Sequence, residues 1–234
     1  MENKKIIIAI GIVLILILGI VGITYLFSSF GKKQMKLLTE ESNKILQSDI
    51  SKDNIDLDIK TEKNYATVEK AIKEYILEIK NIYVEIEELN TGINPNSIFS
   101  IQNMQDKDLK EIDDIITEYK DKSQKCISRL EELMTEEKIL ENIEKRNISS
   151  RKGYYTDLYN TIMLSDMMKE KYTLLNEKVK DEKSKLYEKI NKIDKINEFL
   201  RKNSDSWTIK DDKIQFTNLN RMTEYYNLLN QLTD

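Results

Sequence analysis

Apolar residues recur along the chain at alternating intervals of three and four positions. The clearest series runs without a break from Tyr65 to Leu89. Such spacing places its members on one face of an α-helix, and neighbouring apolar residues widen that face. A broad apolar face favours contact with more than one helix, as in a bundle. The series consists of Tyr65, Val68, Ile72, Tyr75, Ile79, Ile82, Ile86 and Leu89.

Two further segments, 108–133 and 166–202, repeat this heptad spacing. Asp108 and Glu111 have the spacing of a capping box at the start of segment 108–133. The second carries Glu182 at an otherwise apolar position, where it could set the packing register or face a groove. Because long helices joined by short connections fold back on one another, the sequence predicts an antiparallel bundle of about three long helices.

The breaks between these helices are few. Gly92 can take the left-handed conformation that ends a helix, and Pro95 blocks its continuation. Thr135 is placed to cap a short helix, and a loop at 147–153 precedes another short helix at 154–164. With so few breaks, the fold class is expected to be mainly α.

The C-terminal part has a different pattern. Near 206–217 apolar and polar residues alternate, which is typical of β-strands. A two-residue turn at Asp211 and Asp212 would pair Trp207 with Phe216 on one face of a hairpin. An isolated hairpin is marginally stable in water, so this face is expected to lie on the end of the bundle. A terminal helix should follow, with apolar positions at or next to Leu219, Met222, Tyr226, Leu229 and Leu232.

The N-terminal region contains a long apolar stretch without charge at 6–30. As a helix it would be about 37 Å long, which is enough to cross a hydrocarbon core of about 30 Å. A cleaved signal peptide ending near 29–31 is the alternative, but its apolar region would be shorter. We expect a short basic tail at 1–5, a transmembrane anchor, a stalk or linker at 31–60 and a helical bundle domain at 61–234.

The orientation of this anchor is judged from its flanking lysines and from its position at the N-terminus. Lys4 and Lys5 precede the apolar stretch, and Lys32, Lys33 and Lys36 follow it. Counting these charges slightly favours a cytoplasmic C-terminal domain, but the rule is weak when a long domain follows. A short basic tail before a long apolar helix is typical of a signal-anchor. We therefore expect a single-pass protein of the cell membrane with an extracytoplasmic C-terminal domain.

Composition excludes several kinds of chemistry. The chain has a net charge of −4, one cysteine and no histidine. It therefore lacks a histidine-based triad, an internal disulfide and a cysteine-cluster metal site. Mild acidity argues against nucleic-acid binding. No paired arrangement of carboxylates stands out, so we expect no catalytic residue, no metal and no cofactor.

The best candidate for binding is a basic and aromatic loop. It comprises Lys145, Arg146, Arg151, Lys152, Tyr154 and Tyr155. Four cations and two aromatic rings so close together could contact phospholipid headgroups, an anionic wall polymer or an acidic protein face. The alternative is an ordinary solvated loop between helices, with the tyrosines packed inward.

Three other features have simpler explanations. The linker carries an acidic cluster of Asp53, Asp56 and Asp58. A calcium loop starting at Asp53 would need glycine sixth and an acidic residue twelfth, but Asp58 and Asn64 stand there. Cys126 lies on a helical apolar face and is expected to be a small buried residue. Trp207 is expected in the core, with exposed recognition as the alternative.

Two stretches carry a resemblance to other proteins. Residues 58–75, DIKTEKNYATVEKAIKEY, and 199–216, with the single tryptophan, resemble an uncharacterised family of small membrane-anchored helical proteins of low-GC Gram-positive bacteria. The resemblance implies an envelope setting and adds no catalytic residue, because that family has no established activity.

Together these observations predict a non-enzymatic, membrane-anchored envelope protein whose helical bundle binds another envelope protein or itself. Two alternatives stay open. One is an extracytoplasmic ligand-binding or sensing domain. The other is a membrane-tethered coiled-coil protein that faces the cytoplasm.

Overall fold

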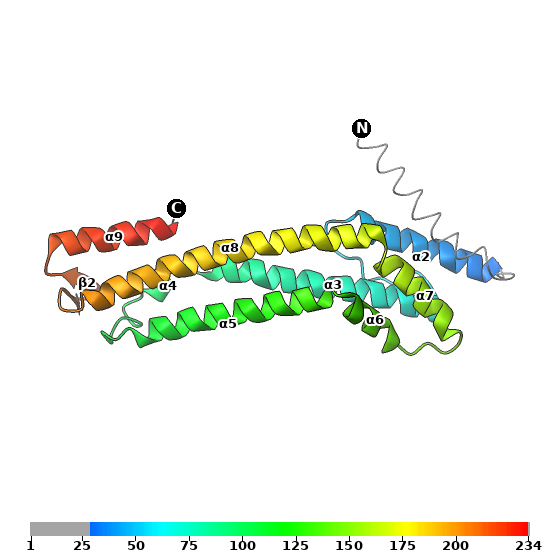
Figure 1. The fold of residues 1–234 in the computed structure, drawn as a ribbon, viewed down its shortest axis with the longest axis horizontal. Coiled ribbons are helices and arrows are strands. Elements are labelled where there is room, and N and C mark those ends of the chain that lie inside the picture. The colour runs from blue at the N-terminus through cyan, green and yellow to red at the C-terminus, as the bar shows by residue number, and fades with distance from the viewer. Residues whose placement is uncertain (1–28, 234) are drawn as a thin grey trace, which may run out of the picture. The chain divides into compact units, whose positions relative to one another are not determined.

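The computed structural model describes residues 29–233, which are mainly helical with one small hairpin (Figure 1). The elements are α2 (Ser29–Gln47), α3 (Lys63–Gly92), α4 (Pro95–Ile98), α5 (Lys110–Leu133), α6 (Glu136–Glu144), α7 (Lys152–Met163), α8 (Asp166–Lys202), β1 (Trp207–Lys210), β2 (Lys213–Phe216) and α9 (Leu219–Thr233). The predicted mainly α class, the small C-terminal hairpin and the final helix are confirmed.

The predicted basic tail at 1–5 and residues 6–28 of the predicted anchor lie outside the described residues. Within the part of the chain that is described, no helix is both long and apolar enough to span a bilayer.

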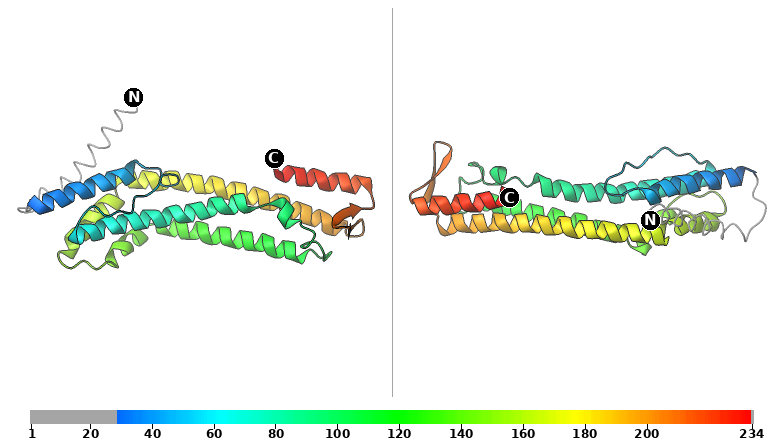
Figure 2. Two further views of the ribbon diagram at one scale, coloured as in Figure 1. Left: turned by 180° about the vertical axis from the view of Figure 1, so that it is seen from behind. Right: turned by 90° about the horizontal axis from the view of Figure 1, so that it is seen from above.

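The described chain divides into two compact units. Unit 1 comprises residues 29–83 and 129–177, and unit 2 comprises residues 84–128 and 178–233. The helices α3, α5 and α8 each supply residues to both units (Figures 1 and 2).

Unit 1 is built from α2, α6, α7 and the adjoining parts of α3, α5 and α8. The part of the predicted α3 face that lies in unit 1 is buried, with Val68 and Ile79 fully inaccessible to solvent. Residues of the expected stalk form α2, where Leu38 and Ile45 are buried at 1% and 5% exposure. The side chain of Thr135 accepts a hydrogen bond from the Lys138 amide, so the predicted cap of α6 is confirmed.

Unit 2 has a core formed by α5, the C-terminal part of α8, the segment after α3, and the hairpin. The helices α5 and α8 run antiparallel, because Lys120 pairs with Asp194 and the earlier Asp113 contacts the later Asn197. The helices α3 and α5 are also antiparallel. The Tyr119 hydroxyl donates to the Gly92 carbonyl at 3.1 Å, and the Cys126 thiol lies 3.5 Å from the Glu85 carboxylate.

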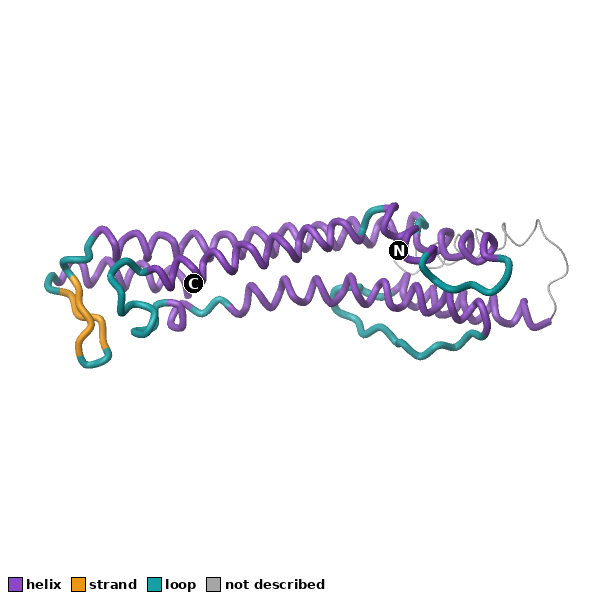
Figure 3. Tube along the Cα trace, turned by 90° about the horizontal axis from the view of Figure 1, so that it is seen from below, coloured by secondary structure: helices purple, strands orange, loops and turns teal. Residues whose placement is uncertain are grey.

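The predicted hairpin forms and is drawn in orange in Figure 3. Its register is the predicted one, with Trp207 paired with Phe216. Both turn residues have left-handed φ angles, 52° at Asp211 and 53° at Asp212, as a two-residue hairpin turn requires. Trp207 is 2% exposed, and its ring Nε1–H donates to the Leu200 carbonyl at 2.8 Å. Its predicted place in the core is therefore confirmed.

The predicted apolar face of α9 is wrong in part. Leu219 and Tyr226 are 70% and 47% exposed, whereas Tyr225 is buried. The Tyr225 ring packs on Phe216 of the hairpin at 5.3 Å between centroids, so the face of α9 that contains Tyr225 is turned toward the hairpin. Figure 2 shows α9 turning back over the C-terminal part of α8 after the hairpin.

Two predicted helix ends also differ. Among the described residues no glycine has a positive φ, so Gly92 is the last residue of α3 and no left-handed cap. The chain continues to Asn94, whose side chain caps α4 ahead of Pro95. The helix α5 begins at Lys110 and not at Asp108, because Leu109 has a φ of 52° and turns its side chain into the core.

Candidate functional site

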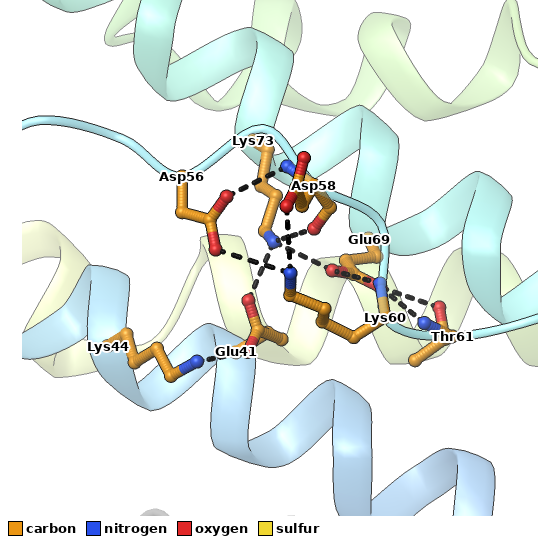
Figure 4. A network of polar contacts seen from close by, with 8 residues as sticks. All are labelled: Glu41, Lys44, Asp56, Asp58, Lys60, Thr61, Glu69 and Lys73. Carbon is orange, nitrogen blue, oxygen red and sulfur yellow. Dashed lines mark hydrogen bonds and ion pairs between the residues drawn. The ribbon is translucent and has the colours of Figure 1, made fainter.

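A cluster of buried charges lies in unit 1, where α2, α3 and the segment at 56–62 meet (Figure 4). At its centre is Lys73, whose side chain is 2% exposed. Its ammonium nitrogen lies 2.6 Å from a Glu41 carboxylate oxygen and 2.7 Å from one of Glu69. It also donates to the Asp58 carbonyl at 2.7 Å. All three ammonium hydrogens thus have an acceptor.

The second buried charge, the Glu69 carboxylate, holds the segment that precedes α3. It accepts hydrogen bonds from the backbone amides of Lys60 at 3.0 Å and Thr61 at 2.9 Å. The Thr61 hydroxyl donates to the same carboxylate at 2.7 Å. Glu69 therefore satisfies backbone groups and the Lys73 cation together, which is how a charge can remain buried.

The rim of the cluster is solvated. Glu41 also pairs with Lys44, and the Lys60 ammonium lies 3.1 Å from Asp58 and 3.6 Å from Asp56. Asp56 and Asp58 of the acidic cluster thus pair with Lys60 inside their own segment, whereas the Glu41–Lys73 pair joins α2 to α3. In the described part of the chain no group of three or more acidic or cysteine side chains could hold a metal ion.

Ion pairing keeps the central groups charged. Burial raises the pKa of the Glu41 and Glu69 carboxyls, but hydrogen bonds from the lysines and Thr61 outweigh it, so both pKa values lie below the ordinary value. Burial lowers the pKa of Lys73, but the two carboxylates outweigh it and the pKa lies above its usual range. The cluster is therefore fitted to hold helices together and not to exchange protons near neutral pH.

Acid should weaken unit 1 through these carboxyls. Because their pKa values are depressed in the folded state, their stabilisation is present above the ordinary value of 4.5 and is lost as the pH falls. We expect the urea midpoint of helix unfolding, followed by circular dichroism, to fall below about pH 4.5. Glu41→Gln should have a lower midpoint at neutral pH and a flatter pH dependence. An unchanged dependence in this variant would contradict the assignment.

The basic and aromatic loop lies in unit 1 beside carboxylates. Three of its cations lie within 3.1 Å of acidic side chains, Lys145 of Glu141, Arg146 of Glu74 and Lys152 of Glu144. Arg151 is exposed at the start of α7 with a left-handed φ of 50°.

The two tyrosines of the loop are half-buried against Tyr65 of α3. Tyr155 meets the Tyr65 ring edge-on at 5.1 Å, and the Tyr154 and Tyr65 hydroxyls are 3.4 Å apart. Burial raises the pKa of Tyr154. These contacts fit the alternative of an inter-helix loop with inward tyrosines, and binding of an anionic surface by the loop stays a prediction.

A groove of about 630 Å³ lies in unit 2 between α3 and α5. The sequence did not predict it. It is lined by Glu85, Glu88, Leu89, Gly92, Ile115, Glu118, Tyr119, Lys122, Lys125 and Cys126. Cys126 is half-buried at this groove and not fully buried as expected.

The groove has an apolar floor and two walls of opposite charge. Leu89, Ile115 and Tyr119 are partly buried and pack against the core of unit 2, so they form the floor. On α3 the exposed wall residues are Glu85 and Glu88, and on α5 they are Glu118, Lys122 and Lys125. The α5 wall is basic at Lys122 and Lys125 and carries Glu118 one turn before them.

Glu182 lies elsewhere in unit 2. Its carboxylate accepts from the Asn90 side chain at 2.6 Å and from Lys185 at 2.8 Å. Of the two roles left open by the sequence, setting the pairing of helices is the one these contacts fit, because Glu182 joins α8 to α3 and does not line the groove.

Comparison with known proteins finds no matching family model, no matching curated protein and no matching solved structure. The resemblance to small membrane-anchored helical proteins therefore stays a prediction.

Proposed function

We propose that this chain is a non-enzymatic, membrane-anchored protein of the cell envelope that acts by binding protein through the groove between α3 and α5. The observation that carries the proposal is the groove itself, an apolar floor between one acidic and one basic wall. Helices that bind other helices commonly present an apolar stripe flanked by charges that select the partner.

The spacing of the wall charges supports a helical ligand. Glu85 and Glu88 are three residues apart on α3, and Lys122 and Lys125 have the same spacing on α5. Residues three apart lie on one face of a helix, so Glu85 and Glu88 form an acidic pair on one wall and Lys122 and Lys125 form a basic pair at the same levels on the other. A partner helix with an apolar stripe and oppositely charged flanks would match both walls.

The membrane part of the proposal rests on the sequence. The uncharged stretch at 6–30 is long enough to form a transmembrane helix, and the basic tail before it favours an extracytoplasmic domain. The finer fold in the proposal is a bundle in which α3, α5 and α8 pack through heptad-spaced residues. The antiparallel contacts of α5 with α3 and with α8 in unit 2 support that arrangement.

A ligand-binding or sensing domain is the second candidate. The volume of the groove, about 630 Å³, falls within the range of small-molecule sites. The mixed charges on its rim would then orient a ligand that carries both an acidic and a basic group.

Site-specific photo-crosslinking tests the first function. A photoreactive residue in place of Lys122, in the full-length chain in its native membrane, should give a discrete protein adduct identifiable by mass spectrometry. The same residue at Thr117, which is exposed on α5 but does not line the groove, is the matched control and should give none. Equal adducts at both positions, or no protein adduct at Lys122, would reject the proposal. The compartment of the partner would also establish the topology.

A further inference from the structure

We infer that the groove binds the same groove of a second copy of this chain, so that α3 of each copy lies over α5 of the other. This inference rests on the proposed function, of which it names the partner. It starts from the charge of the two walls, because a surface with one acidic and one basic wall can be complementary to itself.

The levels of the charges along the groove decide which arrangements are complementary. Glu85 contacts Cys126, and Gly92 contacts Tyr119, so the two antiparallel helices are in a known register. Glu85 is therefore level with the neighbourhood of Lys125. Three residues further along α3, Glu88 is level with the neighbourhood of Lys122. Glu85 and Glu88 on one wall therefore lie at the same positions along the helix axes as Lys125 and Lys122 on the other.

A two-fold axis along the groove, parallel to the helices, exchanges the walls and keeps these levels. It lays Glu85 against the partner subunit's Lys125 and Glu88 against the partner subunit's Lys122. A two-fold axis across the helices would instead lay acidic wall on acidic wall. Like charges brought together at an interface are strongly unfavourable. Charge thus selects the axis parallel to the helices.

Glu118 is an acidic residue on the otherwise basic α5 wall, so its surroundings in this dimer must be considered. Glu118 forms an ion pair with Lys122 on the same helix at 2.5 Å, and both side chains are about 60% exposed. Exposed pairs of this type contribute little to stability, so Lys122 can turn to Glu88 of the other copy at little cost. Glu118 itself lies beyond the level of Gly92, away from both acidic wall residues.

The floor supplies the apolar contact. Leu89, Ile115 and Tyr119 already pack against the core of unit 2 on one side. Covering them with the same residues of another copy would produce four helices around one apolar seam, which is the arrangement of a four-helix bundle.

The direction of the chains fits attachment to one membrane. An axis parallel to the helices keeps α3 of both copies pointing the same way. Such a parallel arrangement is compatible with two chains that enter one bilayer through their N-terminal segments. Anchoring also raises the local concentration, so a contact confined to one groove can form in the membrane although it would be weak in solution.

Cys126 allows the contact between the two grooves to be tested by crosslinking. Cys126 is the single cysteine and lines the groove, so the two copies of its thiol should face each other near the axis. Treating membranes that contain the full-length chain with a short bis-maleimide should give a crosslinked dimer on a denaturing gel. A Cys126→Ser, Thr117→Cys chain, with its thiol outside the groove on the same helix, should give none.

Charge reversal tests the complementarity directly. Lys122→Glu with Lys125→Glu should lower the yield of the Cys126 dimer about tenfold, and adding Glu85→Lys with Glu88→Lys should restore it. Lys195→Glu, an exposed change on α8, should leave the yield unchanged. Rescue by the fourfold variant separates lost contact from lost folding.

The outcomes separate this inference from the proposed function. An unchanged yield in the Lys122, Lys125 variant, absence of rescue, or an equal dimer from Thr117→Cys would overturn the second-copy assignment. If photo-crosslinking at Lys122 captures a different protein while Cys126 gives no dimer, this inference fails and the proposed function stands. If neither experiment gives a protein adduct, both fail.

Discussion

Replacing Lys73 by methionine is expected to destabilise unit 1 by about 3–5 kcal/mol. The methionine fills much of the same volume but leaves Glu41 and Glu69, whose side chains are 6% and 1% exposed, without their cation. Removing one partner of a buried ion pair is costly because the remaining charge stays desolvated. Since Glu41 belongs to α2, hydrogen exchange of α2 amides in the full-length chain should accelerate by more than about a hundredfold.

The control for this variant is Lys44→Met. Lys44 pairs with the same Glu41 carboxylate, but its side chain is 63% exposed. Exposed ion pairs contribute about 0–1 kcal/mol, so exchange in α2 should change by less than about fivefold. Similar exchange rates for the two variants would show that burial of the Lys73 charge does not hold α2.

A triple replacement separates the charge from the packing. Glu41→Gln and Glu69→Gln, combined with Lys73→Met, remove every charge at the centre while keeping side-chain size. Neutralising a whole buried ion cluster costs less than removing one member, because no isolated charge remains. This variant should therefore recover part of the protection that Lys73→Met loses. If it is less stable than the single variant, the hydrogen bonds to Lys60 and Thr61 dominate the cluster.

Periodicity predicted the elements whose contacts are local. All members of the series on α3 follow from one helical repeat, and all but Leu89, which is partly buried, lie in the core. The register of the hairpin follows from a two-residue turn, which leaves only one pairing of Trp207 with Phe216. In both cases the information lies within a few residues.

Elements that depend on distant partners were not predictable in this way. Lysine at position 73 would normally be exposed, and its burial depends on Glu41 and the Asp58 carbonyl, which lie 32 and 15 residues away. The rotation of α9 depends on Tyr225 meeting Phe216, whereas periodicity alone allowed a neighbouring face. The only local signal for the buried cluster was the spacing of Glu69 and Lys73 by four residues, and this spacing is also common on solvated faces.

The groove could not be predicted from the sequence, for a different reason. A charge at position 85 or 122 is unremarkable on a helix in water. The meaning of these charges comes from the pairing of α3 with α5, which brings a row of acids and a row of lysines to the two sides of one apolar strip. Unit 1 therefore uses opposite charges inside the fold to close it, whereas unit 2 leaves them exposed in two separate rows.

Replacing Trp207 by alanine is expected to destabilise unit 2 by about 3–5 kcal/mol. Trp207 is among the largest fully buried side chains, and its removal leaves a cavity where the hairpin meets α8. The Leu200 carbonyl also loses the hydrogen bond from the indole Nε1–H. Because β2 packs on α9 through Phe216 and Tyr225, amides in β1, β2 and α9 should lose protection together.

Two controls make this result specific. Thr208→Ala changes the exposed neighbour in the same strand and should alter exchange by less than about threefold. Trp207→Phe keeps an aromatic ring but not the indole donor, so its loss of stability should lie between the other two. If Trp207→Ala leaves α9 protected while the hairpin alone opens, the packing of α9 does not depend on the hairpin. The contact of Phe216 with Tyr225 would then follow the position of α9 and not determine it.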